Sequence, residues 1–290
     1  MKSHNSVTVV LNVFRRAGAL EEQLSALRKQ TVPVERILVW ENGEDAVPEH
    51  LRSGLVISRV SENLGVWARF AFALNAETEY LLMLDDDTIP GARWIENCIA
   101  TMEKTPGLLG TRGLIFVQPE SYSINVEAGV HAPNEDTVEV DIVGHAWFFK
   151  RAWLSAYWSE YSNKFPEMLA GEDIHFSFAI QKNLGLPTLV PPHPADDLTL
   201  WGSIPDRAVA LGTSQEAISK GSGAMKKFER ALKHYRKLGF QVLSERRPEI
   251  KLNSQYPRII YILAAKYPDF FHWLAAVAPV RSYLSKRSSR

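Results

Sequence analysis

The feature that most constrains this chain is an apolar run that ends in three consecutive aspartates. Residues 80–90 read YLLMLDDDTIP, in which the largely apolar segment up to Leu84 is followed by Asp85, Asp86 and Asp87. A short continuous apolar run is typical of a strand buried on both faces, as in a parallel sheet. Carboxylates at the C-terminal end of such a strand lie where open α/β sheets bind ligands. The sequence therefore predicts a buried strand with an acidic site at its end.

Three adjacent carboxylates repel one another unless a cation or hydrogen-bond donors compensate their charge. In an extended chain Asp85 and Asp87 point to one side and Asp86 to the other. Two carboxylates on one side suit a hard divalent cation that also holds substrate phosphates, so we interpret the triplet as a metal–diphosphate site. The alternative is an acidic cap for the next helix, with Asp87 or Thr88 at the N-cap and Pro90 in the first turn.

Length and composition describe an ordinary folded protein. The 290 residues fit one large domain or two smaller ones, and hydrophobic residues make up 46% of the chain. Cys98 is the only cysteine, which excludes an internal disulfide and is compatible with a reducing compartment. The apolar run at the N-terminus is too short for a signal peptide, and no stretch approaches the length of a membrane span. We expect a cytoplasmic protein.

The formal net charge of zero hides an asymmetry along the chain. Residues 220–290 hold 16 Lys or Arg against 4 Asp or Glu, so the remainder holds 17 against 29. A basic segment of this kind, with aromatic and apolar residues beside its Lys and Arg, suits a helix on an anionic membrane surface. The alternative is a packed C-terminal helix with a solvated basic face. No nucleic-acid recognition motif accompanies the segment, so no nucleic-acid partner is expected.

The first part of the chain alternates strands and helices, as a nucleotide-binding half does. The expected strands are 7–13, 37–40, 55–60 and 80–84, and the expected helices are 19–30, 66–76 and 94–102. A turn is expected at Glu41, Asn42 and Gly43.

The pattern then changes. Strands are expected at 108–117, 137–143 and 188–190, with an aromatic and then helical stretch after Ala146 and a loop at 157–166. A helix is expected to follow Gly171, Glu172 and Asp173 and to stop at Gly185. The expected domains are a catalytic domain at 1–220, with halves at 1–106 and 107–220, and a basic helical extension at 221–290.

Five stretches together carry a resemblance to a known fold family. They are TVVLNVFRR with ILVWENG, ENLGVWARF, YLLMLDDDTI, DIVGHAWFFKRAWL and GEDIHFSFAIQKNLG, in order over residues 7–200. This set resembles the GT-A glycosyltransferases, most closely the exostosin-like glycosyltransferase domain, and family-2 glycosyltransferases share the outline. The resemblance implies an α/β fold, with a Rossmann-like nucleotide-binding half and an acceptor-binding half around one mixed, mostly parallel sheet. It also implies a nucleotide-sugar donor, most often a UDP-sugar, and Mn²⁺ or Mg²⁺. After Asp197 the chain departs from the exostosin-like pattern.

The resemblance also implies roles for individual residues. Asp87 matches the position that typically binds the metal. Asp85 matches the position near the ribose or near the water molecules bound to the metal. The positions near the nucleotide are Arg15 or Arg16, Asn63, Arg69 and the acidic residues Asp85 and Asp86. For Arg15 and Arg16 the alternative is a solvated helix start.

Glu172 and Asp173 match the acidic pair near the anomeric carbon and the acceptor. In an inverting mechanism a carboxylate takes the proton of the acceptor hydroxyl, with Asp173 as the candidate base and Glu172 next. In a retaining mechanism the donor phosphate accepts that proton, and Asp173 orients the acceptor. The alternative is an acidic pair that only stabilises a helix N-terminus.

Further candidates lie in the second half. His193 sits in a PPHP segment, and several GT-A enzymes bring a late histidine to the metal, for which a neutral imidazole is a suitable ligand. A surface histidine in a stiff turn is the alternative. Gly144, His145 and Trp147 follow a strand and are candidates to line the acceptor pocket, although Trp147 also fits a plain core position.

The predicted function is metal-dependent transfer of a hexosyl or N-acetylhexosaminyl group from a nucleotide sugar to a hydroxyl of a glycan or lipid-linked glycan. Polysaccharide biosynthesis at the inner face of a membrane fits this reading. The alternatives are a nucleotidyltransferase that acts on a sugar phosphate and a non-catalytic carbohydrate-binding protein of the same fold.

Overall fold

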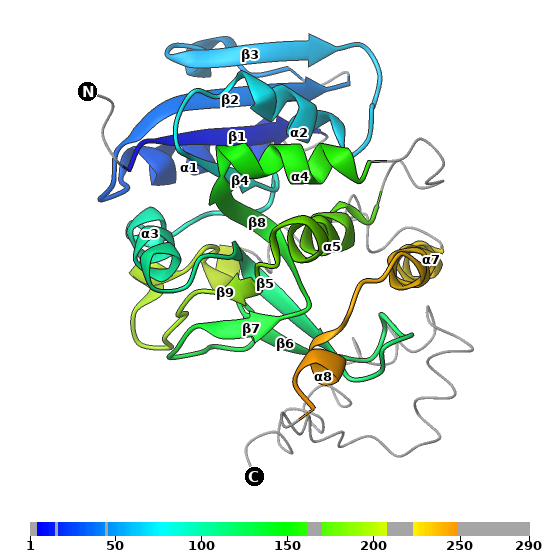
Figure 1. Ribbon diagram of the computed structural model, residues 1–290. Coiled ribbons are helices and arrows are strands. Elements are labelled where there is room, and N and C mark those ends of the chain that lie inside the picture. The colour runs from blue at the N-terminus through cyan, green and yellow to red at the C-terminus, as the bar shows by residue number, and fades with distance from the viewer. Residues whose placement is uncertain (1–4, 15–16, 44–45, 162–169, 208–222, 249–290) are drawn as a thin grey trace.

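The computed structural model describes residues 5–14, 17–43, 46–161, 170–207 and 223–248 (Figure 1). The described strands form one sheet in the order β3-β2-β1-β4-β8-β5-β9-β7, and β6 pairs with β5 beside this path. The strands are β1 (Val7–Val13), β2 (Val34–Asn42), β3 (Leu55–Val60), β4 (Tyr80–Leu84), β5 (Leu108–Phe116), β6 (Asn125–Gly129), β7 (Val138–Val140), β8 (Ile142–Lys150) and β9 (Thr188–Val190).

Helices cover both faces of this sheet, with α4 and α5 in front of it and α1 behind it in Figure 1. The described α-helices are α1 (Ala17–Arg28), α2 (Ala68–Phe72), α3 (Trp94–Lys104), α4 (Leu154–Ser159), α5 (Glu172–Leu184), α7 (Ala224–Lys237) and α8 (Leu243–Arg246). Short 3-10 helices occupy Glu49–Leu51, Ala73–Asn75, Arg151–Trp153 and Leu198–Leu200. Within these described ranges, no helix is both long and apolar enough to cross a lipid bilayer.

The N-terminal half is a parallel sheet. β1 lies between β2 and β4, and β3 extends the sheet beyond β2, all in parallel register. Strands buried on both faces by helices have continuous apolar sequences, which explains why the sequence identified them. β1, β3 and β4 have the predicted bounds, whereas β2 is longer and includes Glu41 and Asn42, which were expected in a turn.

The second half makes the sheet mixed. β8 runs antiparallel between β4 and β5, and β9 runs parallel to β5. Six of the nine described strands share one direction, and only β6, β7 and β8 oppose it. The predicted fold class, an α/β protein around one mixed and mostly parallel sheet, is confirmed.

The segment around Asp141 differs from the prediction. Instead of one strand over 137–143 followed by a helix, β7 ends at Val140 and β8 begins at Ile142. The buried Asp141 carboxylate accepts hydrogen bonds from the backbone N–H groups of Phe116 and Leu243, so it joins β5 to the start of α8. The aromatic stretch forms the end of β8 because both of its faces are buried. A strand of this kind has no alternation that would distinguish it from a helix.

Two smaller elements were not predicted either. β6 lies in a segment that was expected to be a polar loop, and α4 overlaps the loop expected at 157–166. Of that expected loop, residues 162–166 lie outside the described residues.

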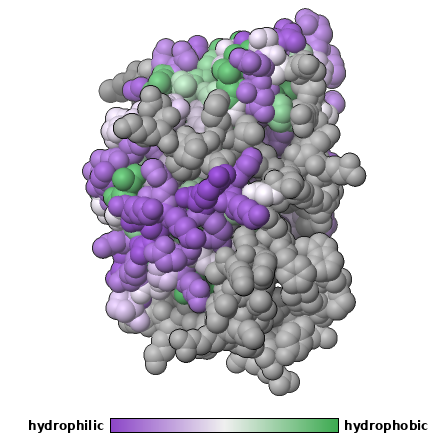
Figure 2. Space-filling view, turned by 90° about the vertical axis from the view of Figure 1, so that its right-hand side faces the viewer, coloured by the Kyte–Doolittle hydropathy of each residue, from purple (hydrophilic) through white to green (hydrophobic). Residues whose placement is uncertain are grey.

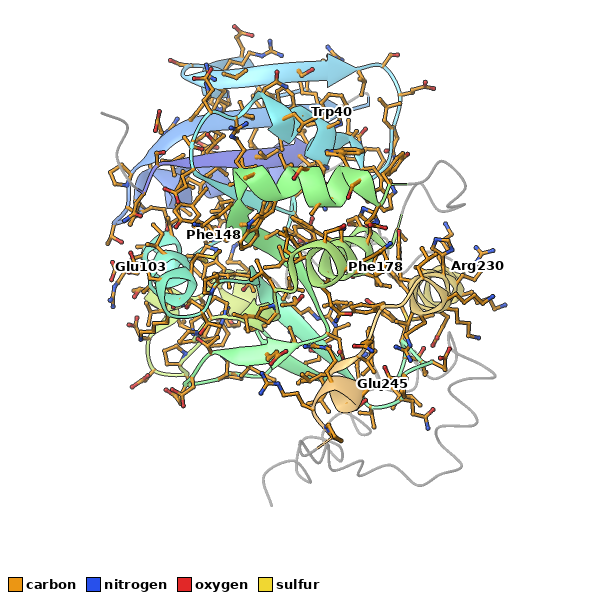
Figure 3. The ribbon with its side chains drawn as sticks, in the orientation of Figure 1. Trp40, Glu103, Phe148, Phe178, Arg230 and Glu245 are labelled. Atoms are coloured by element: carbon orange, nitrogen blue, oxygen red, sulfur yellow. The ribbon has the colours of Figure 1, made fainter. Side chains whose placement is uncertain are left out.

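The described residues after 222 pack on β5 and α5. Leu232 and Tyr235 of α7, with Phe240 beyond it, share a buried cluster with Phe116 and Phe178. Figure 3 shows Phe178 on α5 next to α7, and the Phe178 and Tyr235 rings lie 5.2 Å apart. The helix is therefore part of the folded core, as the packed-helix alternative predicted.

The outer face of α7 is basic. Its exposed cations recur every three or four residues along one side, at Lys226, Arg230, Lys233 and Lys237. Arg230 projects away from the body of the molecule in Figure 3. Figure 2 views the molecule from this side, where most of the described side chains are hydrophilic. Residues 249–290, which carry the rest of the predicted basic extension, lie outside the described residues.

Candidate active site

The acidic loop after β4 is held in place by backbone contacts. It is a tight turn in which the N–H of Thr88 donates to the carbonyl of Asp85 over 3.1 Å. The carbonyl of His145 in β8 accepts from the N–H of Asp85 and from the hydroxyl of Thr88. Gln23 of α1 donates its amide to the carbonyls of Asp85 and Thr88. Elements on both sides of β4 therefore fix the position of the aspartates.

This geometry corrects two expectations. The next helix begins at Trp94 with Arg93 as its N-cap, so the aspartates do not cap it. The chain turns at Asp86 and Asp87 rather than staying extended, so the alternation of side chains does not continue beyond Asp85. Asp86 and Asp87 are both half-buried as residues, and Oδ1 of Asp87 is buried.

Arg69 joins the acidic loop to the start of α5. Its Nη1 donates to Oδ1 of Asp85 over 2.5 Å, and its Nη2 donates to Oε1 of Glu172 over 3.2 Å. The guanidinium carbon lies 4.8 Å from the centre of the Trp147 ring. Arg69 was expected near the nucleotide, and the structure places it between two of the predicted carboxylates.

The start of α5 is shaped by Gly171. Its φ of 93° lies in the left-handed region, which favours glycine. Glu172 and Asp173 follow in the first turn, and Oδ1 of Asp173 accepts from the N–H of Ile174. Burial raises the pKa of both carboxyls. The charge of Asp173 raises the pKa of Glu172 further, and the charge of Asp85 raises the pKa of Asp173 further. The pair therefore does more than complement a helix dipole, because it faces the acidic loop.

Arg112 is a charged residue of this region that the sequence analysis missed. Its Nη2 donates to Glu127 of β6 over 2.5 Å, and its Nη1 lies 3.5 Å from Nε2 of His145. Its charge also lowers the pKa of the Asp173 carboxyl, against the larger opposing effect of burial. The segment LLGTRGLIF has one arginine inside an otherwise apolar run, and a charge on a buried strand needs a partner. This pattern could have identified Arg112 as a candidate site residue.

The three residues predicted to line the acceptor pocket have different positions. Trp147 is 1% exposed and contacts Arg69 and Phe70 in the core, so the prediction that it lines the pocket is wrong. Gly144 and His145 are half-buried beside the acidic loop, and His145 has a φ of 64°. Among the described residues, it is the one non-glycine residue with positive φ. Its backbone, rather than its ring, supports Asp85.

His193 does not join the acidic loop. The residue is fully buried, and its Nδ1 donates to the carbonyl of Pro191 over 2.8 Å. Its Nε2 accepts from the N–H of Gly202 and lies 2.9 Å from the hydroxyl of Thr111. Burial lowers the pKa of His193 to about 4, which keeps the ring neutral. Both ring nitrogens are engaged inside the protein, so the structure does not support the prediction of His193 as a metal ligand.

The remaining nucleotide candidates lie along the first half. Oδ1 of Asn63 accepts from the side chain of Asn42 and from the N–H of Gly65, so it shapes the loop beyond β3. Arg15 and Arg16 lie outside the described residues. Their predicted contact with the nucleotide stays a prediction.

The side chains of the acidic loop alone supply too few ligands for a divalent cation, so a bound substrate would have to supply others. Among the described residues, no group of three or more His, Cys, Asp or Glu side chains is placed to hold a metal. Asp85 and Asp87 supply carboxylate oxygens from one short turn, and Arg69 already engages Oδ1 of Asp85. A site of this kind suits a hard cation whose other ligands are substrate phosphates and water.

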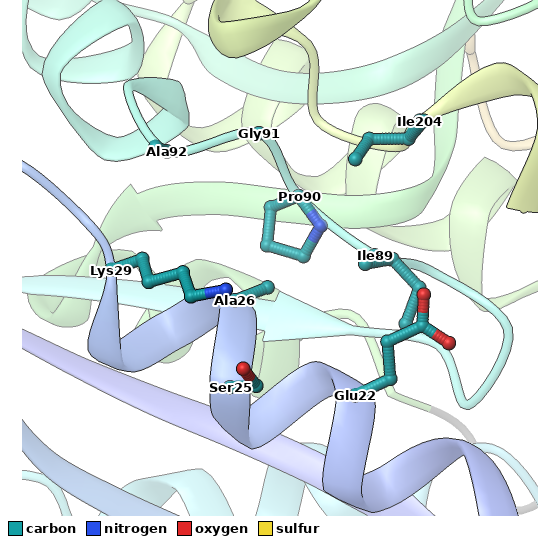
Figure 4. A pocket seen from close by; sticks show the side chains of 9 residues that line it. All are labelled: Glu22, Ser25, Ala26, Lys29, Ile89, Pro90, Gly91, Ala92 and Ile204. Atoms are coloured by element: carbon teal, nitrogen blue, oxygen red, sulfur yellow. The ribbon is translucent and has the colours of Figure 1, made fainter.

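Two surface hollows lie elsewhere. A cavity of about 230 Å³ lies between α1 and the segment from Ile89 to Ala92 (Figure 4), and the Arg207–Glu22 ion pair forms beside it. A cavity of about 240 Å³ lies on α7 between Glu120 and Arg236. Neither cavity is lined by the carboxylates of the acidic loop or of α5.

The chain is similar to several known proteins. Among solved structures, the chain is similar to Staphylococcus aureus TarS residues 1–349, with 14% identity, a TM-score of 0.49 and coverage of 81% of this chain and 73% of that one. A complex of the same fragment with UDP-GlcNAc gives 19% identity, a TM-score of 0.48 and coverage of 66% and 57%. The chain thus spans little more than half of that second TarS chain. None of the curated proteins matches this chain.

The family model named "Glycosyl transferase family 2" matches residues 8–158, which is more than half of the chain. The matched segment contains the parallel half of the sheet, the acidic loop, Arg69 and all of β8. The chain belongs to glycosyl transferase family 2.

Proposed function

We propose that this protein is a metal-dependent glycosyltransferase that moves a sugar from a nucleotide sugar, a UDP-sugar in the first instance, to an acceptor hydroxyl. One observation carries the proposal. Asp85 at the end of β4 and Glu172 at the start of α5 share the guanidinium of Arg69, which brings Asp173 next to the acidic loop. A carboxylate for the donor and a carboxylate for the acceptor therefore belong to one site.

On the donor side, Asp85 and Asp87 would hold Mn²⁺ or Mg²⁺ together with the diphosphate. The chemistry that such a cation would supply is neutralisation of the charge on the leaving diphosphate without a proton transfer. The chain's own contribution is to fix the turn through Gln23 and the carbonyl of His145. A fixed turn presents its carboxylates without reorganisation during the reaction.

On the acceptor side, Asp173 takes the proton of the attacking hydroxyl in an inverting reaction. The new bond joins the acceptor oxygen to the anomeric carbon, and the bond from that carbon to the phosphate oxygen breaks, which releases the nucleoside diphosphate. The raised pKa of Asp173, about 6, suits a general base that works near neutral pH. In a retaining reaction the donor phosphate would accept the proton, and Asp173 would orient the acceptor.

The acceptor that we propose is a glycan or a lipid-linked glycan, and the transferred group is a hexosyl or N-acetylhexosaminyl residue. The basic stripe on α7, formed by Lys226, Arg230, Lys233 and Lys237, supports docking on an anionic membrane where a lipid-linked acceptor would lie. Polysaccharide biosynthesis at that surface is consistent with this arrangement. The likeness to exostosin-like domains stays a prediction about specificity.

The test is a panel of nucleotide sugars incubated with the full-length protein and Mn²⁺, with and without glycan acceptors. We expect release of nucleoside diphosphate from one or a few donors, with glycosylated product detected by mass spectrometry. Release of pyrophosphate from a sugar phosphate and a nucleoside triphosphate would instead identify a nucleotidyltransferase. Binding of sugars without any turnover would identify a non-catalytic protein.

A further inference from the structure

Arg69 occupies a position from which it can set the spacing between the two sides of the site. Building on the proposed transfer reaction, we propose that Arg69 is a positioning residue that ties the donor carboxylate Asp85 to α5 through Glu172. Glu172 is then the partner in this link, and Asp173 alone is left to act on the acceptor.

The geometry is that of an internal clamp. The Arg69 side chain is 6% exposed, and its two terminal nitrogens each donate to a different carboxylate. Those carboxylates come from positions 16 residues and 103 residues away in sequence. A planar guanidinium has a rigid fork of donors, so it can hold two acceptors at a fixed separation. The link therefore sets the distance between the end of β4 and the start of α5.

The plane of the guanidinium is itself held by aromatic rings. Its central carbon lies 4.8 Å from the centre of the Trp147 ring and 5.6 Å from that of Phe70. Trp147 belongs to β8, the neighbour of β4 in the sheet. Stacking on aromatic faces restrains the rotation of the guanidinium, so a shift of α5 cannot be absorbed by a simple turn of Arg69.

The two carboxylates of α5 differ in their partners. Glu172 is 13% exposed and is paired with Arg69. Among the described residues, Asp173 forms no ion pair, and its Oδ1 accepts only a backbone N–H. Oε1 of Glu172 accepts from Nη2 of Arg69, so this carboxylate is engaged in the link between the acidic loop and α5. This difference assigns proton transfer to Asp173 and positioning to Glu172.

The first test compares Arg69→Lys and Arg69→Met with the wild type, using a donor that the wild type accepts. Two rates are measured, transfer to the acceptor and transfer of the same sugar to water. A displacement near 1 Å can cost about 10²-fold in rate, so we expect transfer to the acceptor to fall by about 10²-fold in both variants. Transfer to water needs no alignment with α5 and should fall much less. An unchanged ratio of the two rates would overturn the proposal.

Arg93 provides a matched control. It also pairs with two carboxylates, Glu96 and Asp197, but its side chain is 43% exposed at the start of α3. Arg93→Lys should leave the ratio of transfer to hydrolysis unchanged. A ratio that changed equally in Arg93→Lys and Arg69→Lys would mean that the effect belongs to general loss of stability.

The second test concerns Glu172. Glutamine keeps an oxygen that can accept a hydrogen bond from Arg69, so the turnover of Glu172→Gln should fall by only about tenfold. The turnover of Asp173→Asn should fall by roughly 10²–10⁴-fold, which is what a general base contributes. Equal losses in the two variants would overturn the assignment. Glu172→Leu, which cannot accept a hydrogen bond, should reproduce the low transfer-to-hydrolysis ratio of Arg69→Met.

A stability cycle separates failure of this inference from failure of the proposed function. If the wild type turned over no donor, the proposed function would be wrong, yet the link could still be measured by thermal denaturation. Arg69→Met leaves two carboxylates without their cation. Glu172→Gln should therefore lower the melting temperature of the Arg69→Met variant by less than it lowers that of the wild type. Strictly additive losses would show that Arg69 and Glu172 are not linked.

Discussion

In the proposed reaction, Asp173 is the residue on which the chemistry depends most. It lies in the first turn of α5 next to Glu172, and burial raises its pKa to about 6. Asp173→Asn removes the proton acceptor and keeps the size of the side chain. We expect turnover to fall by about 10²–10⁴-fold, while nucleotide binding measured by calorimetry changes little. Normal turnover in this variant would show that Asp173 is not the base.

Single residues were predicted unevenly from the sequence. Asp85, Glu172 and Asp173 could be singled out because each stands at a recognisable boundary between a strand or a glycine and the next element, and their roles stay predictions. The contacts of Arg69 could not be predicted, because its two partners come from distant segments and meet only in the folded protein. His193 was misassigned, since its stiff proline-rich segment turns the ring inward.

Among the elements, α7 shows how the C-terminal extension contributes to the fold. Leu232 is fully buried in a cluster with Phe116 and Phe178, and the next residue, Lys233, is exposed. We expect Leu232→Ala to lower the free energy of unfolding by about 2–5 kcal/mol, because the cavity remains in a packed cluster. Lys233→Ala, the matched control, should change it by less than about 0.5 kcal/mol. Similar small effects of both in chemical denaturation would contradict the packing of α7.

Two buried histidines on α5 and near β9 predict the response to acid. Burial lowers the pKa of His175 and His193 from 6.5 to about 4. The unfolded chain therefore binds protons that the folded chain does not between these values, so stability falls as the pH drops from 6.5 to 4. Asp141 acts in the opposite sense, because burial raises its pKa from 3.8 to about 6.

The measurement is urea denaturation at several pH values. His193→Gln should be less stable at pH 7 but should lose less of its remaining stability between pH 6.5 and 4 than the wild type loses. The difference corresponds to at most about 3 kcal/mol for a shift of this size. Parallel pH profiles for the variant and the wild type would show that His193 titrates normally in the fold.

At the level of elements, the sequence predicted β1, β3, β4 and β9 well because short apolar runs mark them, and α5 because glycines bound it at both ends. It failed around β8, where an aromatic strand buried on both faces cannot be distinguished from a helix by its pattern. It also failed at β6, whose pairing with β5 depends on residues that are close only in the sheet. Tertiary contacts, rather than local preference, determine both elements.

At the scale of the whole molecule, the basic stripe on α7 predicts binding to anionic membranes. Vesicles containing phosphatidylserine should sediment the full-length protein, and neutral phosphatidylcholine vesicles should not. Each Lys or Arg near such a surface contributes about 1 kcal/mol, so replacing all four residues of the stripe with Gln should weaken binding strongly. Binding should also fall as salt is added. Equal binding of the variant and the wild type would contradict a role for the stripe.

The order of strands explains why one site forms at all. The antiparallel β8 lies next to β4, so the backbone of His145 within β8 meets the acidic loop, and α5 packs on β8. The parallel half of the sheet and the half that contains β8 thus meet there, with Arg69 between the acidic loop and α5. The central claim is that this edge binds a nucleoside diphosphate through a divalent cation.

The most direct measurement of that claim is the melting temperature of the protein with UDP, with Mn²⁺, and with both. We predict a clear rise only with both present, because a ligand at 100 times its Kd stabilises by about 2.7 kcal/mol. Asp87→Ala should lose this rise, whereas Glu103→Ala, which removes an exposed carboxylate of α3 outside the site, should keep it. An equal rise with and without metal, or an undiminished rise in Asp87→Ala, would contradict the account.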